Sequence, residues 1–349
     1  MEPGITQRVD ILLVNPPLST VVLKLRSGLL MAPLGLGYLA AVLEQAGYKV
    51  GLVDMQAEEI RGSGLVRVVQ ERQPQVVGIG TMVNTYKNGL RVARLVKNFS
   101  PTTKVIVGGP QATFLVKETL ACPAVDVLVR YEGEETIVEL MRYFDGDGRR
   151  LDSICGIAFR DGDRIHQTEP RPLIADLDSL PMPARHLFKM DRYGLAIVIT
   201  ARGCPSHCVF CAANALYPSQ SYRERSPHLV VDEIEEMVER YSLDSFFIAD
   251  DTFTLRAEHV MEICDLLIER KIRAKWLCEA RVDTMTPKIA RKLVDAGCIE
   301  VQYGVETGHP EIMKLIRKGI KLKEVEDVVN YSQAMGLNVV CSFIIGFPW

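Results

Sequence analysis

The segment Thr200-Ala201-Arg202-Gly203-Cys204-Pro205-Ser206-His207-Cys208-Val209-Phe210-Cys211 contains three cysteines within eight residues, directly after the apolar run LAIVIT at 195–200. A short apolar run of this kind is typical of a buried strand. Three thiolates at this spacing can bind three corners of one cubic iron–sulfur cluster and leave the fourth iron open. A structural zinc ion normally has four protein ligands, and no second cysteine pair follows. We therefore predict that Cys204, Cys208 and Cys211 bind one [4Fe-4S] cluster, rather than zinc, and are not inert buried thiols.

Apolar runs and helical patterns alternate from this segment to the end of the chain. The expected strands are 195–200, 245–250, 274–279, 299–306 and 338–347. The expected helices are 230–241, 257–270 and 287–296, with a further helical crossover within 310–334. This alternation predicts a second parallel β/α series, and its five strands suggest an incomplete barrel.

A similar alternation precedes the cysteines. The expected strands are 9–14, 49–54, 75–81, 104–109 and 125–130, separated by helical patterns at 33–47, 65–71, 87–98 and 112–120. Continuous apolar runs between helices are typical of a doubly wound parallel sheet with helices on both faces. Each run ends in a polar or Gly/Pro turn, and ligands of open α/β sheets bind at these carboxyl ends.

Between the two series lies a connector with a hairpin at 155–167, which turns at Asp161-Gly162, and four prolines between 170 and 183. We expect a Rossmann-like domain at 1–150, a hairpin and proline-rich linker at 151–193, and a barrel domain at 194–349. The last residues follow directly after a strand, and exposed barrel edges favour aggregation. We therefore expect the chain to be a truncated piece of a longer protein.

The composition argues against several other classes of protein. The 349 residues are 48% hydrophobic and carry a formal net charge of -3, which gives no global attraction for nucleic acid. The first residues lack a signal-peptide pattern, and no apolar run reaches the roughly 20 residues of a membrane-spanning helix. Nine cysteines, three of them clustered, do not form a secreted disulfide framework. We expect a cytoplasmic protein without a nucleic-acid partner or a membrane span.

The pattern Cys-x-x-x-Cys-x-Φ-Cys, with Phe210 as the aromatic residue Φ, resembles the radical S-adenosylmethionine (SAM) superfamily. The resemblance implies that SAM binds the open iron and that the reduced cluster cleaves it to methionine and a 5'-deoxyadenosyl radical. It also implies SAM contacts from residues that follow later strands. These are Asp250 and Asp251 for the amino group, Arg281 for the carboxylate, Glu306 for the ribose and Gly346 for the adenine. The usual Gly-Gly-Glu motif is absent at 250–251.

The turns of the N-terminal series resemble the cobalamin-binding radical SAM family, and the resemblance extends from about Val9 to Pro348. The implied cobalamin contacts are Asn15, Asp54, Thr81, Gly108, Gly109, Gln111, Glu132 and Gly133. For any single glycine, a tight turn or helix packing is the simpler explanation. Gln111 stands where family members often have histidine. No Asp-x-His-x-x-Gly motif begins at Asp54, so we expect a base-off cobalamin whose cobalt has no histidine ligand.

The resemblance implies methylation of an unactivated carbon, with methylcobalamin as methyl donor and a second SAM to regenerate it. Cyclases and rearrangement enzymes of the family remain alternatives, as does a non-catalytic cobalamin or redox protein or an inactive fragment. A methylthiotransferase needs a second cluster, and the first domain offers only Cys122 and Cys155. The expected partners are an unknown organic substrate and an electron donor such as flavodoxin or ferredoxin. Cys264 and Cys341 have apolar surroundings typical of a core, whereas Cys278 could face either the core or the cavity.

Overall fold

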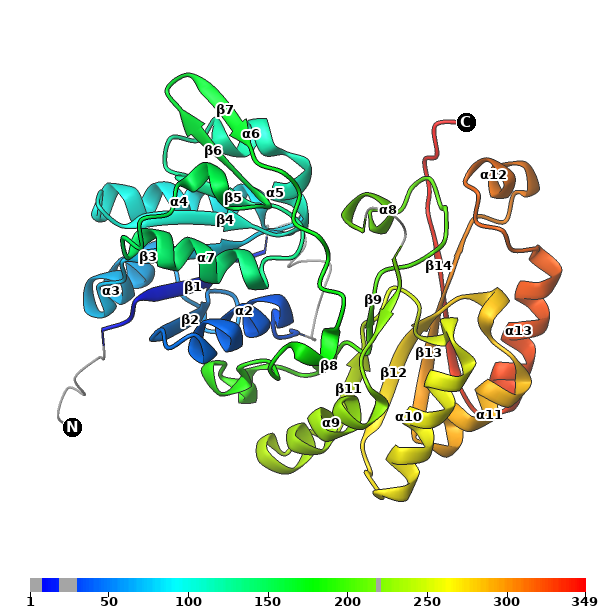
Figure 1. Cartoon of the computed structure of the whole chain (residues 1–349). Helices are drawn as coiled ribbons and strands as arrows, with labels where there is room; N and C mark the ends of the chain where they lie inside the picture. The colour runs from blue at the N-terminus through cyan, green and yellow to red at the C-terminus, as the bar shows by residue number, and fades with distance from the viewer. Residues whose placement is uncertain (1–7, 19–29, 218–220) are drawn as a thin grey trace. The chain divides into compact units, whose positions relative to one another are not determined.

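The computed structural model describes residues 8–18, 30–217 and 221–349. The chain divides into two units, shown in Figure 1. Unit 1 comprises Met1–Ile174 and Leu180–Gly194, and unit 2 comprises Ala175–Ser179 and Leu195–Trp349. No helix within the described ranges is long and apolar enough to cross a membrane.

Unit 1 contains a seven-stranded sheet in the order β2-β1-β3-β4-β5-β6-β7. The strands β1 (Ile11–Asn15), β2 (Val50–Asp54), β3 (Val76–Gly80), β4 (Lys104–Gly108) and β5 (Val127–Val129) run parallel. The carboxyl ends of these five strands therefore lie along one edge. The hairpin β6 (Ile157–Asp161) and β7 (Arg164–Gln167) continues the sheet antiparallel to β5. The hairpin that we expected in the connector is thus part of the sheet of unit 1, and Ile157 and Ala158 of β6 belong to its two hydrophobic cores.

Helices cover both faces of this sheet, as its sequence predicted. They are α2 (Leu34–Gln45), α3 (Gly62–Arg72), α4 (Tyr86–Phe99), α5 (Pro110–Phe114), α6 (Val116–Leu120) and α7 (Glu134–Phe144). Successive residues of β1 alternate between the two faces, as the pleat of a strand requires. Leu12 and Val14 belong to the core that includes residues of α3 and α4. Ile11 and Leu13 belong to the core that includes residues of α2 and α7.

Unit 2 contains a five-stranded parallel sheet in the order β14-β13-β12-β11-β8. Its strands are β8 (Ala196–Val198), β11 (Ser245–Ile248), β12 (Lys275–Ala280), β13 (Cys298–Glu306) and β14 (Asn338–Phe343). The helices are α8 (Ala213–Leu216), α9 (Pro227–Tyr241), α10 (Ala257–Glu269), α11 (Pro287–Asp295), α12 (Pro310–Leu315) and α13 (Leu322–Ala334). The sheet is open within the described residues, with β8 and β14 at its edges. A small antiparallel pair, β9 (Ala201–Arg202) and β10 (Arg223–Glu224), flanks the cysteine segment.

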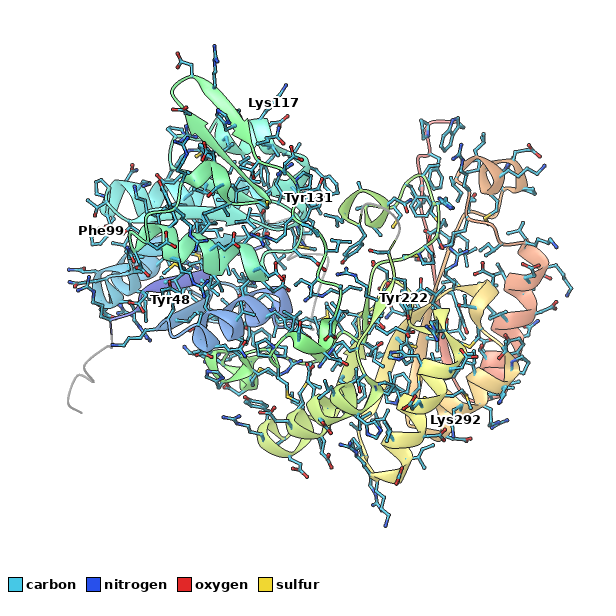
Figure 2. The ribbon with its side chains drawn as sticks, in the orientation of Figure 1. Tyr48, Phe99, Lys117, Tyr131, Tyr222 and Lys292 are labelled. Atoms are coloured by element: carbon cyan, nitrogen blue, oxygen red, sulfur yellow. The ribbon has the colours of Figure 1, made fainter. Side chains whose placement is uncertain are left out.

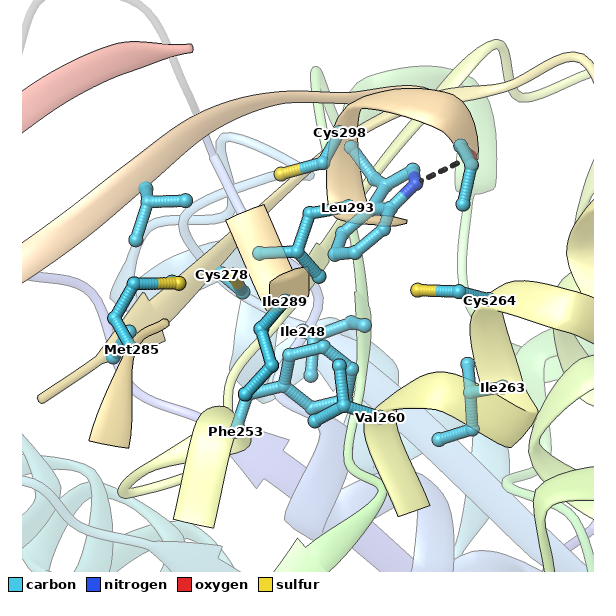
Figure 3. Close-up of a cluster of buried hydrophobic side chains, with 14 of the residues drawn as sticks. Ile248, Phe253, Val260, Ile263, Cys264, Cys278, Met285, Ile289, Leu293 and Cys298 are labelled. Atoms are coloured by element: carbon cyan, nitrogen blue, oxygen red, sulfur yellow. Dashed lines mark hydrogen bonds between the residues drawn. The ribbon is translucent and has the colours of Figure 1, made fainter. Parts of the chain in front are cut away.

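One continuous hydrophobic core joins this sheet to its helices. Trp276 is its largest fully buried side chain; it stacks on Phe246 and donates a hydrogen bond to the carbonyl of Ala296 at 2.8 Å. Figure 3 shows Cys264, Cys278 and Cys298 among the apolar side chains of this core. Cys264 is a core residue, as predicted, and the position of Cys278 is now clear: it faces the core. Cys341 is only partly buried against it.

Candidate functional site

The cysteine segment begins where β8 ends, and the carboxylate of Asp250 fixes its start. Asp250 lies two residues beyond β11, the neighbour of β8, and is fully buried. Its Oδ1 accepts hydrogen bonds from the amides of Thr200 at 2.7 Å and Ala201 at 3.2 Å, and its Oδ2 lies 2.5 Å from the Thr200 hydroxyl. The parallel register of β8 and β11 brings these groups together. Asp250 therefore holds the start of the cysteine segment through hydrogen bonds to Thr200 and Ala201.

A buried histidine completes this network. His259 of α10 places its Nε2 3.2 Å from the hydroxyl of Thr200. Burial lowers the pKa of His259 and raises the pKa of Asp250 from 3.8 to about 7. In both cases the cause is the loss of the water that would stabilise the charged form of the side chain. Hydrogen bonds from the Thr200 and Ala201 amides oppose the shift of Asp250. The Thr200 hydroxyl thus lies between the two buried side chains and contacts both of them.

Gly203 provides the tight turn that leads into the cysteines. Its φ is +92°, a backbone conformation that side chains disfavour. A Cβ at this position would lie 1.8 Å from the carbonyl oxygen of Ser221. Further along, the amide of Val209 donates to the carbonyl of Ile316 at 3.1 Å, which ties the segment to the end of α12. Only glycine at 203 permits this close backbone approach.

Cys204, Cys208 and Cys211 line one pocket of about 290 Å³ at the carboxyl ends of the parallel strands. No three His, Cys, Asp or Glu side chains in the described ranges are arranged to hold a single metal ion. A cubic cluster makes a different demand, because each cysteine binds a separate iron and the thiolates need not converge on one point. Three thiols on the wall of one pocket fit a cluster in this respect. Phe210, the aromatic residue of the motif, also lines the pocket.

The other lining residues carry charges of both signs. The acidic residues are Asp251, Glu279 and Glu306, and the cations are Arg281 and Lys318. SAM carries positive amino and sulfonium groups and one carboxylate, so three carboxylates and two cations are electrostatically suited to it. The predicted residues Asp251, Arg281 and Glu306 are therefore brought together, although they come from three separate strand ends.

Two predicted residues lie elsewhere. Asp250 is not among the residues that line the pocket, and both of its oxygens are engaged by the start of the cysteine segment. Gly346 does not line the pocket either. Its neighbour Phe347 packs against Phe210, with ring centroids 5.9 Å apart. The sequence could not distinguish Asp250 from Asp251, because adjacent residues after a strand face in different directions.

Lys318 is a pocket residue that the sequence analysis missed. It is 7% exposed, and its Nζ lies 3.1 Å from Oε1 of Glu306, which is also buried. The same Nζ lies 5.9 Å from the centre of the Phe210 ring. Lys318 follows α12 in a loop, and its charged neighbours Lys314 and Arg317 are exposed. Without the fold, nothing separates the buried lysine from these neighbours.

In unit 1, the turns after β3 and β4 form a tight backbone junction. The hydroxyl of Thr81 donates to the carbonyl of Gly108 at 2.8 Å, and so does its amide, also at 2.8 Å. Gly109 has a φ of +98°, and a Cβ there would lie 2.5 Å from the carbonyl oxygen of Thr81. Gln111 follows in α5, and its amide lies 3.4 Å from the same oxygen. Thr81, Gly108, Gly109 and Gln111 therefore meet at one point of the carboxyl edge.

Two predicted acidic residues of unit 1 are already engaged. Asp54 is buried; its Oδ1 accepts from the amides of Gln56 and Ala57, and its Oδ2 accepts from the hydroxyl of Tyr193 at 2.9 Å. Glu132 accepts a hydrogen bond from the amide of Ile174 at 2.8 Å. Both carboxylates hold local structure in unit 1.

The remaining predicted positions of unit 1 share its carboxyl edge. Asn15 ends β1, and Gly133 precedes α7. Tyr131, labelled in Figure 2, has a φ of +61° and donates its amide to the Thr113 hydroxyl at 3.1 Å. Met82 and Val83, which follow Thr81, are 54% and 77% exposed and were not predicted from the sequence. Exposed apolar residues beside strand-end amides suit a large flat ligand.

Comparisons with known proteins identify a family for each unit. The model of the radical SAM superfamily matches residues 198–348, and that of the B12 binding domain matches residues 20–141. An uncharacterized methyltransferase of Pyrococcus horikoshii is 33% identical over 346 residues, which cover 97% of this chain and 74% of that protein. Cytidylyl-2-hydroxyethylphosphonate methyltransferase of Streptomyces wedmorensis is 28% identical, over 90% of this chain and 69% of its own length. The solved structure of OxsB, a cobalamin-dependent SAM radical enzyme, superposes with a TM-score of 0.83 at 21% identity, over 97% of this chain and 49% of that one.

Proposed function

The chain belongs to the family of radical SAM enzymes that carry a cobalamin-binding domain, and we propose that it methylates an unactivated carbon of an organic substrate. Its cofactors are a [4Fe-4S] cluster, SAM and cobalamin. The observation that carries the proposal is the pocket in which three cysteines lie beside Asp251, Glu306 and Lys318. When bound, the cluster and SAM supply radical chemistry, and cobalamin supplies a transferable methyl group.

The cysteines would each hold one iron of the cluster. Cys204 and Cys208 leave β9 on a loop whose start is fixed by Asp250, and Cys211 begins the approach to α8. The amide side chain of Asn214 donates to the carbonyl of Cys208 at 2.9 Å, which restrains the middle of the loop. A restrained loop holds its thiolates in place before the cluster arrives, so less ordering is required on binding.

Lys318 and Glu306 would orient SAM. Both side chains are more than 90% buried and pair at 3.1 Å. We propose that the Lys318 ammonium makes the SAM carboxylate contact that the family resemblance implied for Arg281, because the Arg281 guanidinium is already held by Asp283. Glu306 would then accept from the ribose, and Asp251 from the amino group.

A Lys318→Met variant should bind SAM about tenfold more weakly in equilibrium dialysis, since a charged hydrogen bond contributes ~1.5 kcal/mol. Unchanged affinity would exclude this contact.

The carboxyl edge of unit 1 would hold cobalamin. Backbone groups around Thr81 and Gly109, with exposed Met82 and Val83, would contact the corrin. The two histidines of unit 1 are His166 on β7 and His186, whose Nε2 lies 3.0 Å from Glu44; neither follows one of the five parallel strands. This supports a base-off cobalamin. The optical spectrum of the bound cofactor tests it, and a histidine-ligated spectrum would refute it.

The electron donor would be an acidic one-electron carrier such as flavodoxin or ferredoxin. Residues 314–323 contain five cations and no acidic residue, and four of these cations are exposed. Three of the exposed cations, Lys314, Lys321 and Lys323, pair with acidic residues on either side of this segment. A surface hollow of about 780 Å³ is lined by Lys314 and Arg317 together with Ser206 and His207 of the cysteine loop. Complementary charge raises the rate of encounter.

Reversing both charges, Lys314→Glu with Arg317→Glu, should slow cluster reduction by flavodoxin but leave reduction by dithionite unchanged. Equal slowing with both reductants would exclude docking here.

The proposed site requires a reducing environment for its three thiolates, which supports a cytoplasmic location.

Analysis of products tests the whole proposal. Anaerobically reconstituted protein should bind about four irons and one cobalamin per chain. Incubated with SAM and reductant, it should release 5'-deoxyadenosine and also S-adenosylhomocysteine, the product left when SAM donates its methyl group. Formation of 5'-deoxyadenosine without S-adenosylhomocysteine would favour a cyclase or rearrangement enzyme. Absence of both products in protein that holds four irons would refute the proposal.

A further inference from the structure

Arg281 directs one N–H group of its guanidinium at a cysteine of the pocket. The residue follows β12 directly and is 8% exposed. Its Nη1 lies 3.7 Å from Sγ of Cys208, within hydrogen-bonding range for sulfur. Nothing in the sequence connects these two residues, which are 73 positions apart.

The rest of the guanidinium is fixed in place. Nε and Nη2 donate to the two oxygens of Asp283 at 2.9 and 2.7 Å, and Nη2 also donates to the carbonyl of Lys318 at 2.8 Å. A planar guanidinium held by three bonds cannot rotate away, so Nη1 stays directed at Cys208. The Asp283 fork uses two of the five N–H donors, and the Lys318 carbonyl uses a third.

We infer that Arg281 raises the reduction potential of the cluster by donating a charge-assisted hydrogen bond to the Cys208 thiolate. The inference rests on the proposed function at one point, the binding of iron by Cys208. It assigns Arg281 a positioning and tuning role, in place of the SAM carboxylate contact expected from the sequence.

The physical reason is the charge of the reduced cluster. Reduction transfers one electron from the carrier, which is oxidised, to the cluster, which becomes more negative by one unit. Hydrogen bonds to cluster sulfurs and nearby positive charge favour the more negative state and are among the factors that set its potential. The pairing with Asp283 cancels much of the long-range charge of Arg281. The direct N–H···S contact in a buried site therefore accounts for most of the expected effect.

Redox titration of the reconstituted cluster without SAM, followed by electron paramagnetic resonance, tests the inference. Arg281→Gln and Arg281→Met both remove the charged donor, and the methionine variant keeps an unbranched side chain. Each should lower the equilibrium constant for one-electron reduction about tenfold, which is a shift of ~59 mV to more negative potential. Arg281→Lys should recover part of this loss because it keeps a charged donor. Arg273→Gln is the matched control: this exposed arginine lies just before the other end of β12, and its loss changes the net charge equally.

The outcomes separate this inference from the proposed function. If the parent protein lacks four irons or does not cleave SAM, the proposed function fails. If the parent succeeds and the Gln and Met variants retain both four irons and the potential of the Arg273→Gln control, the inference is wrong. If neither variant retains four irons, Arg281 is a structural residue and the inference is also overturned. A purely structural role would leave the potential of any cluster that still assembles unchanged.

Discussion

The two units place candidate sites at the same kind of edge but build them from different groups. Both have a parallel sheet whose carboxyl ends gather the predicted residues. In unit 2 these ends present thiols and charged side chains to one pocket, including Cys204, Arg281 and Glu306. In unit 1 they present backbone groups and small residues, such as Thr81 and Gly109, while Asp54 is used within its own turn.

The proposed ligands would account for this difference. A cluster and SAM present iron and formal charges, which thiolates and ionised side chains recognise. A corrin is large, flat and lined with amides, so amides and close backbone approach suit it better. A site built from side chains should lose its ligand when one key side-chain atom is removed. A site built from backbone groups should lose its ligand only when the turn itself is deformed.

Replacement of one sulfur tests the side-chain site and has the largest expected effect. Cys208→Ala should remove the cluster, its visible absorption and all SAM cleavage, because one iron loses its protein ligand. Iron analysis and product assays measure these losses. Cobalamin content should stay near one per chain, since unit 1 is unchanged.

The matched control is Cys341→Ala on β14, whose side chain does not line the pocket. It should keep about four irons. SAM cleavage by the Cys208→Ala protein at the parent rate would contradict the cluster assignment.

Deformation of one turn tests the backbone site. Gly109→Ala forces a left-handed residue and places a Cβ 2.5 Å from the Thr81 carbonyl. Strain and overpacking together should cost about 3 kcal/mol and weaken cobalamin binding. Urea unfolding and cobalamin titration measure the two effects. Gly146→Ala, also at positive φ but with open space around it, should lower stability less and leave cobalamin affinity intact. Equal losses in both variants would show that strain alone is responsible.

The sequence predicted the fold well because burial dictates its pattern. Apolar runs such as residues 104–109 became strands, and their order along the chain matched the structure. The three cysteines were identifiable because their spacing is local. Lys318 and the orientation of Arg281 were not, since both depend on contacts between segments distant in sequence. Asp250 and Asp54 look alike as strand-end acids, and only the fold reveals that each is bound to nearby backbone amides.

The buried network behind the cysteine loop makes stability depend on pH. Burial raises the pKa of Asp250 to about 7 in the folded state, against 3.8 when exposed. Folding favours the protonated form of Asp250. Its contribution to the free energy of unfolding is therefore complete below pH ~4 and is lost as the pH rises through about 7. The free energy of unfolding should therefore fall across this range by up to ~1.4 kcal/mol per pH unit.

Asp250→Asn should remove that slope. The lowered pKa of His259 gives a slope of opposite sign in both proteins, so the difference between them isolates Asp250. Chemical unfolding at several pH values from 4 to 8 makes the comparison. Asp244→Asn, at an exposed position before β11, should leave the parent profile unchanged. Parallel profiles for the parent and Asp250→Asn would mean that Asp250 stays ionised in the folded protein.

The smallest predicted effect concerns Asp54, the buried carboxylate that accepts hydrogen bonds within unit 1. Tyr193 donates to Asp54 at 2.9 Å in a buried position, and Tyr48 donates to Asp145 at 2.9 Å in an exposed one. Tyr193→Phe should lower the free energy of unfolding by ~1 kcal/mol, because a buried carboxylate oxygen loses its donor. Tyr48→Phe, which makes the same chemical change in the same unit, should cost less than ~0.5 kcal/mol because water replaces the hydroxyl. The midpoints of urea unfolding measure both. If cobalamin affinity fell in Tyr193→Phe but stability did not, Asp54 would be a cofactor contact after all, and unit 1 would share the side-chain strategy of unit 2.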